Sequence, residues 1–126
     1  MNKFKKKSIE LAKKIVKDRA GWKCEKCGRT KKQGWQMHGA HIIPVEYSNT
    51  CCLVENIICL CAKDHSMGRD SAHEHPLLFS EWFNKKYPGR YDKLWEIARE
   101  VRPIYSSEWE ERYNELKKIS HSLKKK

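Results

Sequence analysis

The first regular pattern of apolar and polar positions along the chain has helical spacing. Between residues 8 and 20, apolar side chains fall on one helix face, which holds Ile9, Ala12, Ile15 and Val16. Ser8 can cap the N-terminal end of such a helix, and Gly21 suits its C-terminal end. The pattern therefore predicts a helix over about residues 8–20.

The pattern becomes strand-like in the middle of the chain. Residues 36–45 have the composition of a strand that stops at Pro44, and residues 57–60 form a short apolar run suited to a buried strand. The intervening residues are expected to form a loop. The sequence is polar again after Cys61, and we expect a helix from there to about Ala72. A hairpin followed by a helix is therefore predicted.

The C-terminal part of the chain has helical patterns only. Apolar and aromatic side chains recur in two segments that end before Pro88 and Pro103, and Ser107 with Glu110 forms the capping box of a last helix. We assign the aromatic side chains of these segments to packing. The 126 residues therefore predict a single α+β domain with a helical extension over about residues 84–124.

Charge is distributed unevenly along this domain. The net charge is +11, with +10 over residues 1–35, −3 over residues 36–75 and +4 over residues 76–126. Basic outer segments attract polyanions such as nucleic acids, and a slightly acidic central segment that holds most of the histidines suits a bound cation. A lysine-rich surface kept only for solubility would give the same net charge.

The cysteines are better explained by metal binding than by disulfides. No stretch approaches the roughly 18 consecutive apolar residues of a membrane span, and the basic start is not followed by an apolar signal core. We therefore expect a cytoplasmic protein. In that reducing compartment, Cys24 and Cys27, a C-x2-C knuckle followed by Gly28, are typical of a metal site.

An ordered set of residues in the central segment carries the most specific signal. His41 lies in the run AHIIP, Asn56 precedes the second predicted strand, and His65 follows that strand. This order resembles the HNH (ββα-metal) endonuclease family, and the upstream knuckle resembles the zinc-containing branch found in phages and bacteria. The resemblance covers about residues 22–83. It implies a hairpin-and-helix core with a zinc knuckle. The N-terminal and C-terminal helices that the apolar patterns predict would flank this core.

The resemblance also implies a role for each of these residues. His41 would be the general base that deprotonates the attacking water, and Asn56 would hydrogen-bond across the loop and orient His41. His65 would bind a catalytic Mg²⁺, or Mn²⁺ or another divalent ion. The substrate would be double-stranded or branched DNA, and the products would carry 5′-phosphate and 3′-hydroxyl ends.

The sequence departs from the family pattern around the catalytic ion. Family members place Asp or His just before the general base as a metal ligand, and here that position is Ala40. A further helix histidine would lie one turn after His65, and here that position is Arg69. On a continuous helix His65, Arg69 and His73 share a face, so we expect His65 and His73 to hold the ion and Arg69 to bind phosphate.

The sequence allows alternative roles for three of the histidines. His38 could reach the ion from the first strand as a substitute ligand. An ordinary polar helix terminus accounts for His73 and His75 equally well.

The family's second knuckle would also have the spacing C-x2-C, but here it is Cys61-x2-Asp64. A carboxylate is an accepted zinc ligand, so a structural Zn²⁺ could be bound by Cys24, Cys27, Cys61 and Asp64. Cys59 competes for the fourth position, although a buried strand cysteine that acts as a small apolar side chain is the simpler interpretation.

A metal-dependent DNA endonuclease is the function that these features favour. The N-terminal helix, Lys31 and Lys32 would then contact phosphates. Ala40 favours the alternative of a non-catalytic, zinc-stabilised nucleic-acid-binding module, whereas His41 and Asn56 speak against it. A zinc domain for protein interaction fits the basic charge least well.

Overall fold

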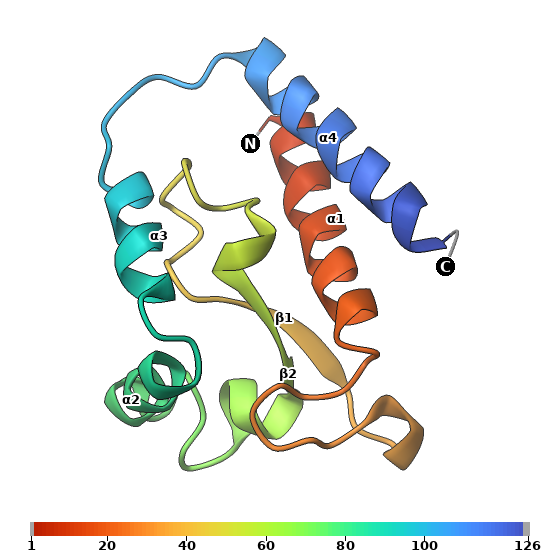
Figure 1. Ribbon diagram of the computed structural model, residues 1–126, viewed down its shortest axis with the longest axis vertical. Helices are drawn as coiled ribbons and strands as arrows, with labels where there is room; N and C mark the ends of the chain where they lie inside the picture. The colour runs from red at the N-terminus through yellow and green to blue at the C-terminus, as the bar shows by residue number, and fades with distance from the viewer. Residues whose placement is uncertain (1, 125–126) are drawn as a thin grey trace.

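The computed structural model describes residues 2–124, in which helices surround one small antiparallel sheet (Figure 1). The expected mixture of helices and strands is confirmed. Four α-helices and two strands are joined by loops and by three short helical turns within this range. No helix in residues 2–124 combines the length and the apolar character needed to cross a membrane.

The two strands form the hairpin at the centre of the fold. β1 (Met37–His41) pairs with β2 (Ile57–Cys61), with the last residue of β1 opposite the first of β2, and every residue of β2 is buried. β1 is shorter than the strand expected over residues 36–45. After β1, the next two backbone N–H groups donate hydrogen bonds to Asn56. Ile42 N–H donates to the backbone oxygen of Asn56 (2.8 Å), and Ile43 N–H donates to Asn56 Oδ1 (2.7 Å).

Helix α1 (Lys3–Arg19) packs between the hairpin and helix α4 (Ser106–Lys124) (Figure 1). It begins earlier than the predicted residue 8. Asn2 caps it, because its Oδ1 accepts hydrogen bonds from the backbone N–H groups of the first turn. Ser8, the expected cap, is instead buried within the helix. The prediction of a helix was thus right, and the predicted cap was wrong.

The main core forms where α1, the hairpin, α2 and α4 meet. Its apolar members include residues from the predicted stripes of the first and last helices, namely Ile9, Ala12, Ile15, Val16, Trp109 and Leu116. The helix α2 (Pro76–Lys86) adds Phe79 and Phe83. The aromatic side chains at these positions therefore serve packing, as expected.

The segment after β2 is not the continuous helix predicted up to Ala72. A single π-helical turn, η3 (Lys63–Met67), follows the strand and stops at Gly68, whose ψ of 158° is extended. The chain then folds back, and Ala72 N–H donates to the backbone oxygen of Asp64 (2.8 Å). Non-local backbone hydrogen bonds thus replace those that a longer helix would have formed.

Helix α3 (Arg90–Ala98) covers the loop between the strands. Its Leu94 and Ala98 form a second, smaller cluster with Ile43. The helix ends at Ala98, and Val101 is 99% exposed, so the apolar pattern expected to continue to Pro103 is not helical there.

Candidate metal centre and histidine site

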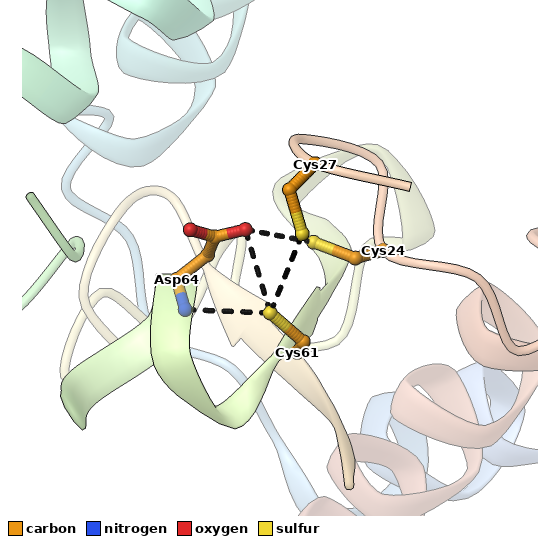
Figure 2. Close-up of side chains that lie close together, drawn as sticks. All are labelled: Cys24, Cys27, Cys61 and Asp64. Carbon is orange, nitrogen blue, oxygen red and sulfur yellow. Dashed lines mark hydrogen bonds between the residues drawn. The ribbon is translucent and has the colours of Figure 1, made fainter. Parts of the chain in front are cut away.

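Three cysteines and one aspartate from two distant parts of the chain converge on one point (Figure 2). The ligand atoms of Cys24, Cys27, Cys61 and Asp64 all lie within 4.8 Å of one another. This is the set expected from the sequence. The group could hold a metal ion such as zinc.

Local backbone geometry brings these ligands together. In the knuckle, Cys24 N–H donates to the backbone oxygen of Arg29 (2.8 Å), and Gly28 N–H donates to that of Cys24 (3.0 Å). Gly28 has a φ of 80°, a conformation that favours glycine, which explains its place after the C-x2-C pair. Cys61 ends β2 and Asp64 lies in η3, so the change from strand to turn presents both side chains to the knuckle.

The spacing of the donor atoms fits a tetrahedral zinc ion. With Zn–S bonds of about 2.3 Å, tetrahedral geometry places two sulfur ligands about 3.8 Å apart. The Sγ atoms of Cys27 and Cys61 are 3.6 Å apart, and Asp64 Oδ2 lies 3.2 Å from Cys24 Sγ and 3.4 Å from Cys61 Sγ. Cys59 is not a member of the group and packs in the core, as the simpler interpretation required.

Protonation equilibria in this group couple metal binding to pH. Burial raises the pKa of Cys24 to about 12 and also raises the pKa of Cys61. Burial acts to raise the pKa of Asp64 as well, but hydrogen bonds from the three neighbouring thiols outweigh it and hold that pKa below its usual value. Asp64 is therefore ionised at neutral pH, and a cation binds the cysteines as thiolates only by displacing their protons.

Arg29 is a neighbour of this group that the sequence did not single out. Its Nη1 donates to Cys27 Sγ (2.9 Å) and lies 3.9 Å from Asp64 Oδ2. Three thiolates and one carboxylate around a divalent ion would carry a net charge of −2, which the guanidinium partly offsets. Only the position of Arg29 two residues after Cys27 could have suggested this role.

Three histidines gather beside this group. The Nδ1 atoms of His38 and His65 are 2.7 Å apart, and the ring centroids of His65 and His73 are 4.5 Å apart. His38 lies on β1 and His65 in η3, while His73 reaches its neighbour because its N–H donates to the backbone oxygen of His65 (3.1 Å). The expected ligands His65 and His73 are thus brought together, and the suggested substitute His38 joins them. The chain that folds back after η3 brings His73 to His65, in place of the continuous helix that was predicted.

The rings of His38 and His65 are electrically neutral near pH 7. Burial, followed by the charges of His73, His38 and Lys13, lowers the pKa of His65 to about 4. Burial, with the charges of Lys17 and Lys13, also lowers the pKa of His38. Neutral imidazole is the form that binds a metal ion.

His41, at the end of β1, has a fixed ring orientation. Its Nε2 lies 2.7 Å from the backbone oxygen of Cys51. A carbonyl can only accept, so Nε2 carries the proton and Nδ1 of the neutral ring carries the free lone pair. Burial, helped by the charge of Lys13, lowers the pKa of His41 below its usual value despite the opposing effect of that hydrogen bond.

Asn56 holds the loop that orients His41. It is fully buried, its Oδ1 accepts from Ile43 N–H, and its Nδ2 donates to the backbone oxygens of Ile43 and Thr50, each at 3.0 Å. Thr50 directly precedes Cys51, the residue whose carbonyl accepts the hydrogen bond from His41 Nε2. Asn56 therefore forms hydrogen bonds across the loop, next to the residue that contacts His41.

The remaining predicted residues do not join the histidine cluster. Arg69 is exposed beyond the end of η3, so it does not share a helix face with His65, and the expectation that it would is wrong. Ala40 is buried in the core. His75 caps α2, because its Nδ1 accepts from Leu78 N–H (3.2 Å), which agrees with its interpretation as a helix terminus.

Lys31 and Lys32 lie in η1 (Lys31–Gln33), an exposed turn after the knuckle. Lys31 Nζ lies 4.4 Å from the ring centroid of Trp22. Sequence reasoning missed the part played by Cys51, because a backbone carbonyl leaves no mark on residue type. It also missed Lys13, whose charge acts on three histidines from α1.

Comparisons of the chain with models of protein families, with curated proteins and with solved structures found no match. The function is therefore inferred from the chain's own side chains.

Proposed function

We propose that this protein is a metal-dependent endonuclease that hydrolyses DNA phosphodiester bonds, with His41 as the general base. The observation that carries the proposal is the oriented imidazole of His41, whose charge also acts on the pKa of His65. A buried asparagine ties the loop whose carbonyl fixes that ring, as the resemblance to the HNH family implies. The basic net charge of +11 is consistent with a polyanionic substrate.

His41 has the properties that proton abstraction needs. Its Nδ1 lone pair is free to accept a proton from water, and its lowered pKa keeps the ring neutral at pH 7. The resulting hydroxide would form a bond to phosphorus while the bond from phosphorus to the 3′ oxygen breaks. The 3′ oxygen would leave with a proton from solvent, which gives the 5′-phosphate and 3′-hydroxyl ends.

The donor set of the histidine cluster bears on which ion could assist. Mg²⁺ prefers oxygen ligands in a nearly octahedral arrangement, and His38, His65 and His73 offer only nitrogen, so these side chains do not fit Mg²⁺ well. Imidazole ligands suit Zn²⁺ and Ni²⁺ better. Such an ion, when bound, would polarise the phosphoryl oxygen and stabilise the leaving oxygen.

Asn56 is a positioning residue in this proposal. It touches neither water nor phosphate, and its three hydrogen bonds fix the loop that holds His41. A binding module would have no need for an oriented His41 ring, although the same hydrogen bonds would stabilise its loop as well.

A non-catalytic, zinc-stabilised nucleic-acid-binding module is the second candidate. Ala40 is the observation that favours it, because a buried methyl group occupies the position where the family has a metal ligand. The two candidates differ in hydrolysis and not in binding, so a cleavage assay separates them.

The test is cleavage of supercoiled plasmid by the zinc-loaded chain with added Mn²⁺, Ni²⁺, Co²⁺ or Mg²⁺. We expect nicking or linearisation that His41→Ala reduces by roughly 10²- to 10⁴-fold. His121→Ala is the matched control, because His121 is an exposed histidine on α4, and it should cut like the unchanged chain. Binding without cutting under every ion would replace the endonuclease with the binding module.

A further inference from the structure

A basic cavity of about 690 Å³ lies away from the histidine cluster. Its wall is formed by the end of α1, the knuckle, the turn before β2, and the facing ends of α2 and α3. Five cationic side chains line it, against two carboxylates, Glu25 and Glu55; the cations are Arg19, Lys23, Lys26, Lys86 and Arg90. No histidine and no residue of β1 lines it.

The positive charge of this basic cavity is not cancelled by its own carboxylates. None of the five cations forms an ion pair within residues 2–124. Glu25 directs its carboxylate to other groups, since its oxygens accept from Tyr87 OH (2.7 Å) and Cys59 N–H (2.6 Å). The excess of positive charge in the cavity therefore remains available to an anion.

Arg90 is the cation of the basic cavity with the most hydrogen bonds to the protein. Its Nε donates to the backbone oxygen of Glu55 (2.7 Å), its Nη2 lies 3.4 Å from that of Ile57, and its guanidinium lies 4.9 Å from the ring centroid of Tyr87. A guanidinium has five N–H donors, and these two contacts use two of them. The group is thus held in place with donors to spare, an arrangement suited to a phosphate.

We propose that the basic cavity binds the phosphate backbone of a nucleic-acid strand outside the point of cleavage. The proposal rests on the proposed nucleic-acid substrate but not on its hydrolysis. Cations outnumber carboxylates in the cavity wall, no aromatic side chain lines it, and its apolar residues Val16 and Ile57 are buried. Such a wall is typical of backbone contacts and not of base recognition. The three cations that come from residues 1–35 belong to the most basic part of the chain.

The first test measures the salt dependence of binding to a labelled DNA duplex, with His41→Ala as background so that the DNA stays intact. The cavity variant carries Arg19→Gln, Lys23→Gln and Lys86→Gln, all exposed positions. The logarithm of the binding constant falls against the logarithm of salt concentration by about 0.9 per phosphate contact. We expect this slope to become shallower by about 2 to 3 in the cavity variant.

The matched control loses the same charge on α4, through Lys117→Gln, Lys118→Gln and Lys124→Gln, which are also exposed. Its slope should become shallower by less than about 1. Equal changes in the two variants would overturn the proposal, since they would show an effect of net charge alone. Circular dichroism and zinc content verify that both variants are folded.

A second measurement needs no cavity variant. Acetylation of lysines in the His41→Ala background, read by mass spectrometry, should show that DNA protects Lys23, Lys26 and Lys86 but not Lys117 and Lys118. Equal protection by inorganic phosphate at the same phosphate concentration would show a site for a small anion, and equal protection by polyglutamate would show an acidic-protein site. Either result overturns the proposal, whereas a plasmid assay without cleavage contradicts only the proposed hydrolysis.

Discussion

The cysteine–aspartate group and the histidine cluster are neighbours that differ in how they are built. The first has its four ligand atoms within 4.8 Å of one another and three of its members buried, with no position left for a substrate. The histidine cluster has only nitrogen donors, which come from β1, from η3 and from the chain that folds back after η3. His73 is exposed. A closed site of four protein ligands is typical of structural metal, and an open site of three is typical of catalysis.

The two sites nevertheless share one short segment. Cys61 and Asp64 belong to the first site and His65 to the second, and all three lie at the end of β2 and in η3. A metal ion on the first site would therefore fix the turn that presents His65. A closed site that holds an ion would therefore stabilise the fold, whereas the open site would depend on that fold, and substitutions should affect the two unequally.

The largest expected effect is that of breaking the closed site. Cys24→Ser should abolish stoichiometric zinc binding and cooperative thermal unfolding, because structural zinc contributes folding free energy directly, on the order of 10 kcal/mol in small zinc domains. Elemental analysis and circular dichroism measure both properties. Cys59→Ala is the control, a buried cysteine outside the group that should keep its zinc. A folded Cys24→Ser chain without zinc would contradict the structural role.

The next largest effect is that of Asn56→Ala, which changes the hydrogen bonds of the loop but removes no metal ligand. Asn56→Ala leaves buried backbone groups without partners and should lower the free energy of unfolding by about 3 kcal/mol. It should also reduce cleavage, because the carbonyl that orients His41 loses its support. Asn49→Ala is the matched control: Asn49 is also buried, but its Nδ2 donates to Ile97 and Glu100 near α3. If both variants cut at the same rate at a temperature where both are folded, Asn56 has no positioning role.

A smaller effect tests the open site alone. His38→Ala should raise the Mn²⁺ concentration needed for half-maximal cleavage by at least about tenfold, with zinc content and thermal unfolding little changed. His75→Ala removes a histidine that only caps α2, and its metal requirement should stay that of the unchanged chain. The contrary result, in which both variants behave alike, would exclude His38 as a ligand.

The smallest effect concerns pH. In the proposed mechanism the neutral form of His41 is the active base, and its lowered pKa means that kcat/KM should fall to half only below pH 6.5, the usual value for histidine. Lys13→Gln removes one of the charges that lower this pKa and keeps the Cβ and Cγ atoms that lie against Gly39. The half-point should then move upward by a few tenths of a pH unit. A downward shift would contradict the assignment of His41 as the base.

Sequence patterns predicted the closed site better than the open one. The ligands of the closed site follow from residue type and spacing. Because η3 is short, the spacing in Cys61-x2-Asp64 is enough to determine how these two side chains lie relative to each other. The position of His73 beside His65 depends on non-local backbone hydrogen bonds after Gly68, which a helical pattern cannot show. The contact of His41 with a carbonyl is likewise independent of the side chain of Cys51.

The positions of the helices could be predicted from the sequence, whereas their ends could not. The apolar faces of α1 and α4 follow from spacing, because packing determines which residues must be apolar. The start of α1 at Lys3 depends on which of two capping residues, Asn2 or Ser8, is free of the core, and only the packing decides that Ser8 is buried.

The separation in sequence between the two halves of the cysteine–aspartate group has a consequence for the unfolded chain. Cys27 and Cys61 are 34 residues apart, and the intervening segment includes β1 and the loop whose carbonyl orients His41. A cross-link across such a segment lowers the conformational entropy of the unfolded chain by an amount equivalent to about 4 kcal/mol at 25 °C, by analogy with a disulfide. Zinc captured early would thus shorten the search for the native hairpin, and the supply of zinc in the cell would set how much of the newly made chain reaches its folded form.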